Sequence, residues 1–278
     1  MRRISSEQIR DLVSELCIEA NTRLRGDVLR ALNDALKREK NKRAKRFLEI
    51  ILENALIAKK ERLAICQDTG LPVIFLELGE DIEVRGDLKS AVNKGVELGY
   101  KKGCLRNSVV PHPLLRSKPK YSPPVMHIDI TKGSRLKIMV LPKGFGCENK
   151  TQLKMFRPTA DVDEIKEFII KTVKDAGPNA CPPYIVGIGI GGTADYACLL
   201  AKKALLRKIG VMNQDLKVSK LEDELLREIN RLNIGPMGLG GETTALGVNI
   251  EIYSTHIAGL PVAVNISCHA LRSAIRKI

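Results

Sequence analysis

The sequence is poor in aromatic residues: its 278 residues include no tryptophan, five tyrosines and five phenylalanines. Binding of single-stranded nucleic acid depends on aromatic stacking platforms, so this composition offers little for that function. The sequence also lacks a run of 18 apolar residues and an apolar segment near its N-terminus, so it predicts neither a membrane span nor a signal peptide. We therefore expect a cytoplasmic protein.

Charge is strongly unbalanced, with 46 Lys and Arg residues against 32 Asp and Glu residues and a net charge of +14. Such a surplus suits nucleic acid or an anionic small molecule, and Lys and Glu enrichment is also typical of hyperthermophile proteins. The most basic stretch, residues 37–46, is best interpreted as a solvated helix face. We favour an anionic substrate and expect no nucleic-acid partner.

Cysteine occurs seven times, an odd number, and never as C-x-x-C. In a chain without an export signal this pattern argues against a disulfide framework, a zinc knuckle and a thioredoxin-like site. The remaining interpretations are buried structural cysteines, or a few cysteines that the fold brings together.

Hydrophobic periodicity changes along the chain. Residues 1–62 have the three- and four-residue spacing of helices, introduced by a capping-box pattern at Ser5 and Gln8. From residue 63 short β-rich runs, among them 73–76, 136–141, 184–190 and 262–267, alternate with helical stretches. We find no repeat or low-complexity linker. The sequence predicts an α+β fold with α/β character, in which a helical N-terminal part (1–62) precedes a mixed-sheet α/β part (63–278) within a single domain, 1–278.

Four segments combine glycine-bearing turns with chemically active side chains. Functional loops commonly hold polar groups in this way at the ends of strands. The four segments are Cys-Gln-Asp-Thr-Gly at 66–70, a glycine loop at 144–151, a glycine-rich stretch at 181–193, and the segment 255–269 with His256.

The stretch 181–193 satisfies G-x-G-x-x-G through Gly187, Gly189 and Gly192, after a predicted strand and before a predicted helix. That context fits a dinucleotide site, but no strand ending in an acidic residue follows about 20 residues later. Nicotinamide binding is therefore a minor alternative. A glycine-rich turn at a helix N-terminus can serve any anion.

Three of the four segments carry a cysteine beside a tight turn or prolines, namely Cys66, Cys181 and Cys268. Three thiolates can hold a [4Fe–4S] cluster by three of its corners, which leaves the fourth iron open to oxygen ligands. An open iron is a Lewis acid, so this arrangement points to non-redox chemistry on a hydroxy acid.

Together these motifs resemble the α subunit of class I, iron–sulfur fumarate hydratases and the related α subunit of L(+)-tartrate dehydratase. The resemblance extends over essentially the whole chain, and five motifs in the same order make it specific. They are Cys-Gln-Asp-Thr-Gly at 66–70, Leu-Arg-Asn-Ser-Val at 105–109, Gly-Cys-Glu-Asn-Lys at 146–150, the segment 181–193, and Thr-His-Ile-Ala at 255–258.

The resemblance implies an oxygen-sensitive [4Fe–4S] cluster held by Cys66, Cys181 and Cys268. It also implies that the open iron binds the hydroxyl and one carboxylate of a C4 dicarboxylate substrate. The substrate contacts that it implies come from Gln67, Asp68, Arg106, the backbone at Gly146, and His256, with Asp68 and His256 as the catalytic residues.

Elementary chemistry agrees with these roles. The guanidinium of Arg106 can donate two parallel hydrogen bonds to a carboxylate. Loss of a hydroxyl requires a base for the proton on the neighbouring carbon, and Asp68 is the best local candidate for acid–base work or for orienting the catalytic group. Cys147 lies in a glycine loop, which suits backbone contact with substrate more than cluster ligation.

The resemblance further implies a second subunit, because single-chain members of the family carry a further domain with catalytic and carboxylate-binding groups. The chain ends at Ile278, shortly after Cys268, so we expect a separate β subunit and an α2β2 assembly. The expected reaction is the reversible hydration of fumarate to (S)-malate. L(+)-tartrate dehydration is the alternative, and a basic nucleic-acid-binding or scaffold protein with buried cysteines is a distant one.

Overall fold

The structure, a computed structural model, describes residues 2–278 and divides into two compact units. Its helices and mixed sheets confirm the α+β fold class. The predicted helical part, 1–62, contributes to both units, and the single domain 1–278 stays a prediction. Unit 1 comprises the chain up to Arg25, Asn54–Phe145 and Arg272–Ile278, and unit 2 comprises Gly26–Glu53 and Gly146–Leu271.

Unit 1 contains two helices and six strands, together with the end of a third helix, α3 (Lys42–Glu61), that begins in unit 2. The two helices are α1 (Ser6–Thr22) and α4 (Leu88–Lys102). The strands are β1 (Arg2–Ser5), β2 (Leu71–Gly79), β3 (Ile82–Arg85), β4 (Val125–Thr131), β5 (Leu136–Lys143) and β10 (Ala274–Lys277).

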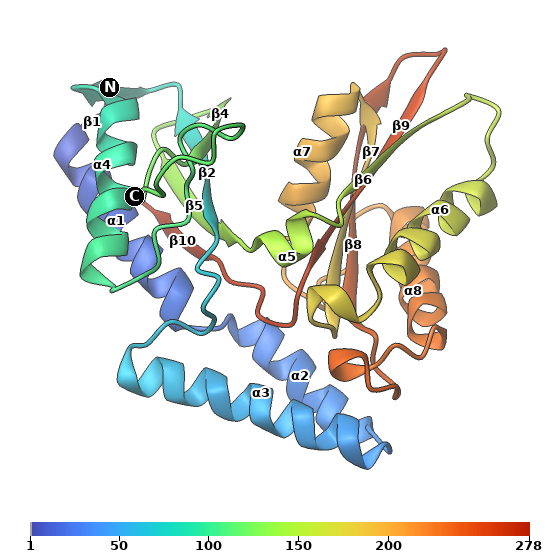
Figure 1. Cartoon of the computed structure of the whole chain (residues 1–278). Helices are drawn as coiled ribbons and strands as arrows, with labels where there is room; N and C mark the ends of the chain where they lie inside the picture. Colours follow the sequence, from blue (N-terminus) through green and yellow to red (C-terminus); the bar gives the residue numbers. More distant parts are fainter. Residues whose placement is uncertain (1) are drawn as a thin grey trace. The chain divides into compact units, whose positions relative to one another are not determined.

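The main sheet of unit 1 has the strand order β10-β5-β2-β4, and β1 pairs separately with β3. β5 is antiparallel to both β10 and β2, whereas β4 is parallel to β2. Helices α1 and α4 lie along one face of this sheet (Figure 1). Apolar side chains of that face pack against both helices in one buried cluster.

The start of α1 confirms the predicted capping box. The Ser5 hydroxyl accepts a hydrogen bond from the N–H of Gln8 at 3.2 Å, and the Gln8 side-chain carbonyl accepts one from the N–H of Ser5 at 2.9 Å. These two bonds satisfy backbone donors that have no partner inside the helix. The helix then buries the side chains of Ile9, Val13 and Leu16 completely.

Unit 2 is built around a second four-stranded sheet. Its helices are α2 (Gly26–Arg38), most of α3, α5 (Phe145–Glu148, which begins in unit 1), α6 (Val162–Ala176), α7 (Ala194–Ala204) and α8 (Leu216–Arg231), with 3-10 turns η1 (Gly177–Ala180) and η2 (Pro236–Gly238). Its strands are β6 (Gln152–Phe156), β7 (Tyr184–Gly192), β8 (Ala245–Thr255) and β9 (Leu260–Ser267).

The sheet of unit 2 has the order β6-β9-β7-β8, with β7 parallel to β8 and antiparallel to β9. Helices α6 and α8 pack on one face in a large apolar cluster, and α7 packs on the other face (Figure 1). The two inner strands are therefore buried on both sides.

The glycines of the G-x-G-x-x-G pattern serve helix packing. Gly187 and Gly189 lie inside β7, where an added Cβ would come within 2.2 Å of the Ala201 carbonyl oxygen and 2.1 Å of the Ala197 carbonyl oxygen of α7. Only glycine allows the backbones of β7 and α7 to approach so closely. The pattern thus has a structural explanation that needs no nucleotide.

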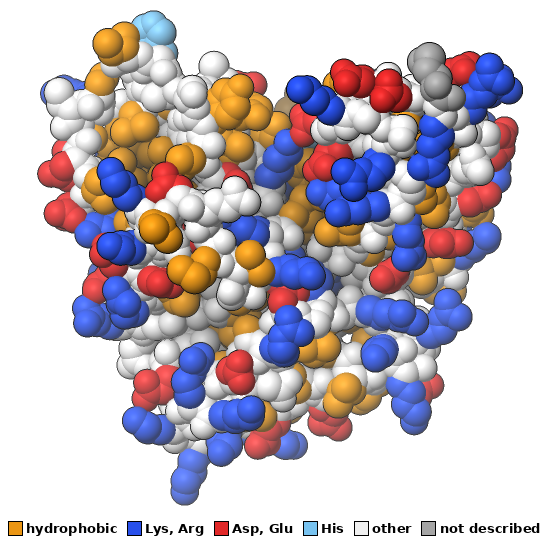
Figure 2. All heavy atoms as spheres, turned by 180° about the vertical axis from the view of Figure 1, so that it is seen from behind, with side chains coloured by type: hydrophobic (Ala, Val, Ile, Leu, Met, Phe, Trp, Pro, Cys, Tyr) orange, Lys and Arg blue, Asp and Glu red, His pale blue; other side chains and the backbone are white. Residues whose placement is uncertain are grey.

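Basic residues are spread over the surface. The Lys and Arg side chains of residues 37–46 are exposed at the end of α2 and the start of α3, as predicted for a solvated stretch. On the face shown in Figure 2, basic and acidic side chains are interspersed. Within residues 2–278, no helix is long and apolar enough to cross a bilayer.

Close packing of α1 against α4 makes a testable prediction about Gly99. A Cβ at this position would lie 2.5 Å from the Ser14 carbonyl oxygen. Overpacking costs about 1–3 kcal/mol, which exceeds the gain of at most about 1 kcal/mol in helix propensity. We expect Gly99→Ala to lower the melting temperature, measured by circular dichroism.

The matched control is Gly26→Ala at the start of α2, where the nearest neighbour of an added Cβ is the end of the Arg30 side chain at 3.6 Å. This variant should melt at the wild-type temperature or slightly above it. A Gly99→Ala protein as stable as the Gly26→Ala protein would contradict the described packing.

Candidate functional site

Asp68 anchors the loop 66–70 of unit 1. One carboxylate oxygen accepts the N–H of Gly70 at 3.0 Å, and the other accepts the N–H of Phe145, the first residue of α5, at 2.8 Å. The Asp68 carbonyl oxygen accepts a hydrogen bond from Nη2 of Arg272 at 2.6 Å. The carboxylate therefore tightens its own turn and ties it to the residue that precedes Gly146.

The local sequence explains this conformation. Gly70 has φ +74°, and a Cβ there would lie 2.7 Å from the carbonyl carbon of Pro142, so the turn requires glycine. Buried Thr69 donates its hydroxyl to the Arg106 carbonyl at 3.0 Å, and its own carbonyl accepts the hydroxyl of Tyr100 at 2.8 Å. Thr69 thus joins the two loops that carry predicted site residues.

Unit 1 in this way gathers four of the predicted site residues on two adjoining loops. Cys66 and Asp68 are half-buried, whereas Gln67 and Arg106 are exposed. The exposed guanidinium of Arg106 is therefore accessible to an anion, and it can donate two parallel hydrogen bonds to a carboxylate.

Arg272 is a member of this site that the sequence analysis missed. Its side chain is 3% exposed, and besides Asp68 it approaches the Asn21 side-chain oxygen at 3.5 Å through Nη1. Its Nε has no hydrogen-bond partner in the described structure. No motif surrounds Arg272 in the sequence, so only the fold shows that a buried cation supports the loop 66–70.

In unit 2 the pairing of β7 with β9 brings two predicted cluster ligands to the same end of the sheet. Ile185 lies opposite Ser267, so Cys181 precedes β7 where Cys268 follows β9. The Cys181 carbonyl oxygen accepts a hydrogen bond from the N–H of His269 at 3.3 Å. Nδ1 of the His269 ring lies 3.1 Å from the same carbonyl oxygen. Cys181 is exposed with φ +56°, and Cys268 is half-buried.

A buried tyrosine lies among the thiols of unit 2. Tyr184 is fully buried and donates its hydroxyl to the Gly177 carbonyl. Burial raises the pKa of Tyr184, and the nearby thiols of Cys147, Cys181 and Cys268 raise it further. Tyr184 also packs in the same apolar cluster as Cys147 and Cys268.

The remaining cysteines divide by burial. The thiol of Cys147 is buried and donates to the Ala180 carbonyl at 3.2 Å, which is the geometry of a packed thiol. Complete burial raises the pKa of Cys17, so this thiol stays protonated in the core of unit 1. Burial also raises the pKa of half-buried Cys198, whereas Cys104 is exposed.

The structure places His256 away from Cys181 and Cys268. His256 lies in the turn between β8 and β9, and its Nδ1 accepts the N–H of Ala258 at 3.1 Å, which leaves the proton of a neutral ring on Nε2. The eight residues of β9 separate this turn from Cys268, a distance of roughly 25 Å along the strand. Unit 2 therefore brings Cys181 and Cys268 together but does not bring His256 to them.

The full ligand set stays a prediction. Cys66 belongs to unit 1, whereas Cys181 and Cys268 belong to unit 2. Over residues 2–278, no three Cys, His, Asp or Glu side chains form a group that could hold a metal ion.

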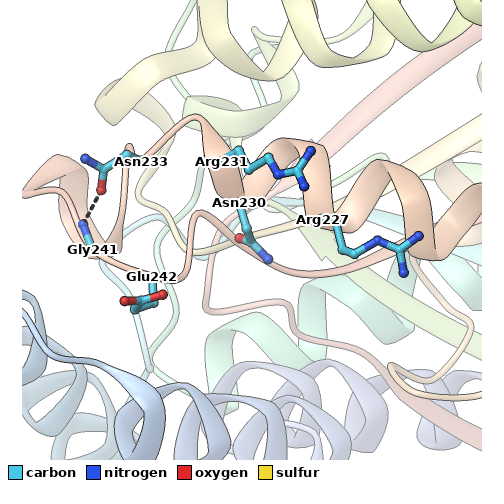
Figure 3. Close-up of a pocket in the computed structure, with 6 residues that line it drawn as sticks. All are labelled: Arg227, Asn230, Arg231, Asn233, Gly241 and Glu242. Atoms are coloured by element: carbon cyan, nitrogen blue, oxygen red, sulfur yellow. Dashed lines mark hydrogen bonds between the residues drawn. The ribbon is translucent and has the colours of Figure 1, made fainter.

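A polar cleft of about 430 Å³ lies elsewhere in unit 2, between the end of α8 and the loop that precedes β8 (Figure 3). The Asn233 side chain accepts the N–H of Gly241 at 2.8 Å across this loop. Arg227, Arg231 and Glu242 also line the cleft. None of the predicted site residues lines it.

Comparison with known proteins assigns this arrangement to a class of enzyme. The chain belongs to the fumarate hydratase (Fumerase) family, a family of hydro-lyases whose model matches residues 10–277. It is 44% identical over 279 residues to a Methanocaldococcus jannaschii protein provisionally named L(+)-tartrate dehydratase subunit alpha, with 98% of each chain covered. It is 30% identical over 269 residues to the L(+)-tartrate dehydratase subunit alpha of Escherichia coli K12, covering 95% of this chain and 89% of the relative.

The Asp68 carboxylate accepts hydrogen bonds from two backbone N–H groups, and this predicts the effect of Asp68→Asn on stability. An amide has one acceptor oxygen, so one backbone N–H loses its acceptor and faces an NH2 group. We expect the free energy of unfolding, measured by urea denaturation, to fall by about 1–3 kcal/mol.

The control is Asp175→Asn, which removes an exposed ion pair with Lys171 on α6 and should cost less than about 0.5 kcal/mol. Equal stability losses in the two variants would contradict the anchoring role of Asp68.

Proposed function

We propose that the chain is the α subunit of a two-subunit [4Fe–4S] hydro-lyase that catalyses the reversible hydration of fumarate to (S)-malate. The observation that carries this proposal is the β7–β9 pairing, which holds exposed Cys181 and half-buried Cys268 at one end of a rigid sheet. Membership of the fumarate hydratase family supports the reaction class.

The cysteines proposed as ligands fit an iron–sulfur cluster in their chemistry. Cys66, Cys181 and Cys268 are all accessible or half-buried and none forms a disulfide in the described structure, whereas Cys17 and Cys147 are buried. Thiolates are the ligands that such clusters prefer. When bound by three cysteines, the cluster supplies one Lewis-acidic iron for the hydroxyl and carboxylate oxygens of the substrate.

The chain's own polar groups would bind and orient the rest of the substrate. Arg106 is exposed and can donate two hydrogen bonds to a carboxylate, and the exposed amide of Gln67 lies on the adjoining loop. Gly146 is open, because a Cβ added there would meet no atom within 4 Å. We propose that this glycine lets a carboxylate approach the backbone of the loop closely.

Asp68 could act in acid–base catalysis or could orient the catalytic group. Its contacts favour the orienting role. Its oxygens hold the N–H groups of Gly70 and Phe145, and this fixes the loop that carries Cys66 and Gln67. Each oxygen also keeps a second lone pair, so a proton acceptor role is compatible with these contacts.

His256 requires a different arrangement. A four-carbon substrate is far shorter than β9, so it cannot contact His256 and Cys268 of the same unit. His256 can act in the proposed site only when it enters from a second copy of the chain, with Nε2–H as the donor toward the substrate.

A separate β subunit is part of the proposal. The relatives of this chain are named as α subunits of L(+)-tartrate dehydratase, which supports assembly with a second type of subunit. We propose that this β subunit completes the site and that the enzyme is an α2β2 heterotetramer.

L(+)-tartrate is the second candidate substrate. The names of the relatives favour it, and it differs from malate by one hydroxyl. The polar groups described above contact features that the two substrates share, so they serve either dianion.

The reaction can be tested with the chain co-produced anaerobically with its β subunit. We expect (S)-malate to give fumarate, detected by proton nuclear magnetic resonance, because the site binds a C4 dicarboxylate and removes water. Turnover of L(+)-tartrate to oxaloacetate, without turnover of malate, would select the second candidate. Turnover of neither by an iron-loaded preparation would contradict the proposed function.

If Cys181 is a ligand of the iron–sulfur cluster, substitution of Cys181 and of Cys104, both exposed, should affect iron content differently. Cys181→Ser should reduce both the iron and acid-labile sulfide content and the hydro-lyase activity at least about tenfold, because a serine hydroxyl replaces a thiolate ligand. Cys104→Ser, a change at another exposed cysteine, should leave both unchanged. Equal metal content in the two variants would overturn the assignment of Cys181.

A further inference from the structure

His269 connects the two segments that carry the proposed cysteine ligands of unit 2. It directly follows Cys268 in the sequence, and its backbone N–H donates a hydrogen bond to the Cys181 carbonyl oxygen at 3.3 Å. Nδ1 of its ring lies 3.1 Å from the same oxygen. A carbonyl oxygen only accepts hydrogen bonds, so the ring makes this contact as a donor, with a proton on Nδ1. One residue thus donates twice to the backbone of Cys181.

These contacts lie beyond the end of the strand pairing. The described register of β7 with β9 ends at the pair Ile185 and Ser267, so it stops before it reaches either cysteine. Two prolines, which have no N–H to donate, separate Cys181 from the start of β7. The contacts of His269 therefore continue the link between the two segments where the ladder has ended.

The backbone conformation of Cys181 requires such support. Its φ of +56° lies in the left-handed region, which a residue with a Cβ rarely adopts. Cys181 is exposed, so burial contributes little to holding it in place. Its N–H donates to the Pro178 carbonyl oxygen at 3.3 Å, and this bond is as long as the backbone bond from His269. The ring contact at 3.1 Å lies within the normal range for a hydrogen bond, so the side chain of His269 supplies the stronger restraint.

We propose that His269 is a positioning residue for the iron–sulfur cluster, because its Nδ1–H fixes the backbone of Cys181 to the segment that carries Cys268. The inference rests on the proposed function, since it takes both cysteines as cluster ligands. Groups that form hydrogen bonds around a metal centre orient its ligands, and their loss weakens metal binding about 10–100-fold. The role depends on the hydrogen bond alone, so it requires no charge on the ring.

Three substitutions separate the hydrogen bond from the size of the side chain. Asn carries its amide nitrogen directly on Cγ, as His carries Nδ1, so His269→Asn keeps a donor at that position. His269→Gln places the amide one bond further out, and His269→Leu has no donor.

The measurement is the rate at which a chelator removes iron from the chain, co-produced with its β subunit and reconstituted anaerobically, followed by the visible absorbance of the cluster. We expect His269→Leu and His269→Gln to lose iron at least about tenfold faster than the wild-type protein. His269→Asn should lose iron at nearly the wild-type rate. If His269→Asn lost iron as fast as His269→Leu, the proposal would be overturned.

The matched control is His112→Leu. Nδ1 of His112 accepts the N–H of Leu115 at 3.1 Å in an exposed loop of unit 1, so this variant also removes one histidine hydrogen bond. It should leave the rate of iron loss unchanged. An equal acceleration in His112→Leu and His269→Leu would show a general effect of histidine removal and would contradict a specific role for His269.

A second readout needs no cluster. Nuclear magnetic resonance of the iron-free full chain with isotope-labelled histidine should show a proton on Nδ1 of His269. A proton on Nε2 alone would overturn the proposal whatever the iron content.

The outcomes for this inference and for the proposed function differ. A wild-type protein that keeps its cluster, with a His269→Leu variant that keeps it equally well, would overturn the role of His269 and leave the proposed function intact. A wild-type protein that binds no cluster on reconstitution would overturn both.

Discussion

The antiparallel pairing of β7 with β9 is the constraint on which the candidate site of unit 2 depends. It brings the start of β7 and the end of β9 to one end of the sheet, where both Cys181 and Cys268 lie. Gly187 and Gly189 allow α7 to pack directly on β7, which fixes the strand from the other side. The β8–β9 turn lies at the opposite end of the same sheet. The pairing of β7 with β9 therefore places the two cysteines at one end and His256 at the other.

In unit 1 the site residues are held by hydrogen bonds within loops instead of by strand pairing. Its loop 66–70 has no regular structure, and its conformation comes from hydrogen bonds to the side chain and carbonyl of Asp68 and from buried Arg272. A site built on loops needs such support, since small displacements of a binding group weaken orientation and catalysis. The exposed side chains of Gln67 and Arg106 are thus presented from a backbone that buried residues keep in place.

Periodicity predicted the longer elements well, because each buries a regular apolar face. The predicted runs at 73–76, 136–141, 184–190 and 262–267 all fall inside strands. The strands β1, β3, β6 and β10 have only four or five residues, and they form through pairing with remote segments that leaves no periodic signal. The turn contexts of Cys66, Cys181 and Cys268 were visible in the sequence. The support from Arg272, the position of His256 and the packing role of the β7 glycines depend on long-range contacts.

We propose above that Cys66, Cys181 and Cys268 act together as ligands of one iron–sulfur cluster. Alkylation of the anaerobic, iron-loaded chain, followed by peptide mass spectrometry, tests it most directly. We expect these three thiols to react slowly until a chelator removes the iron, whereas exposed Cys104 should react at the same rate throughout. Equal alkylation of all three thiols before and after removal of the iron would contradict it.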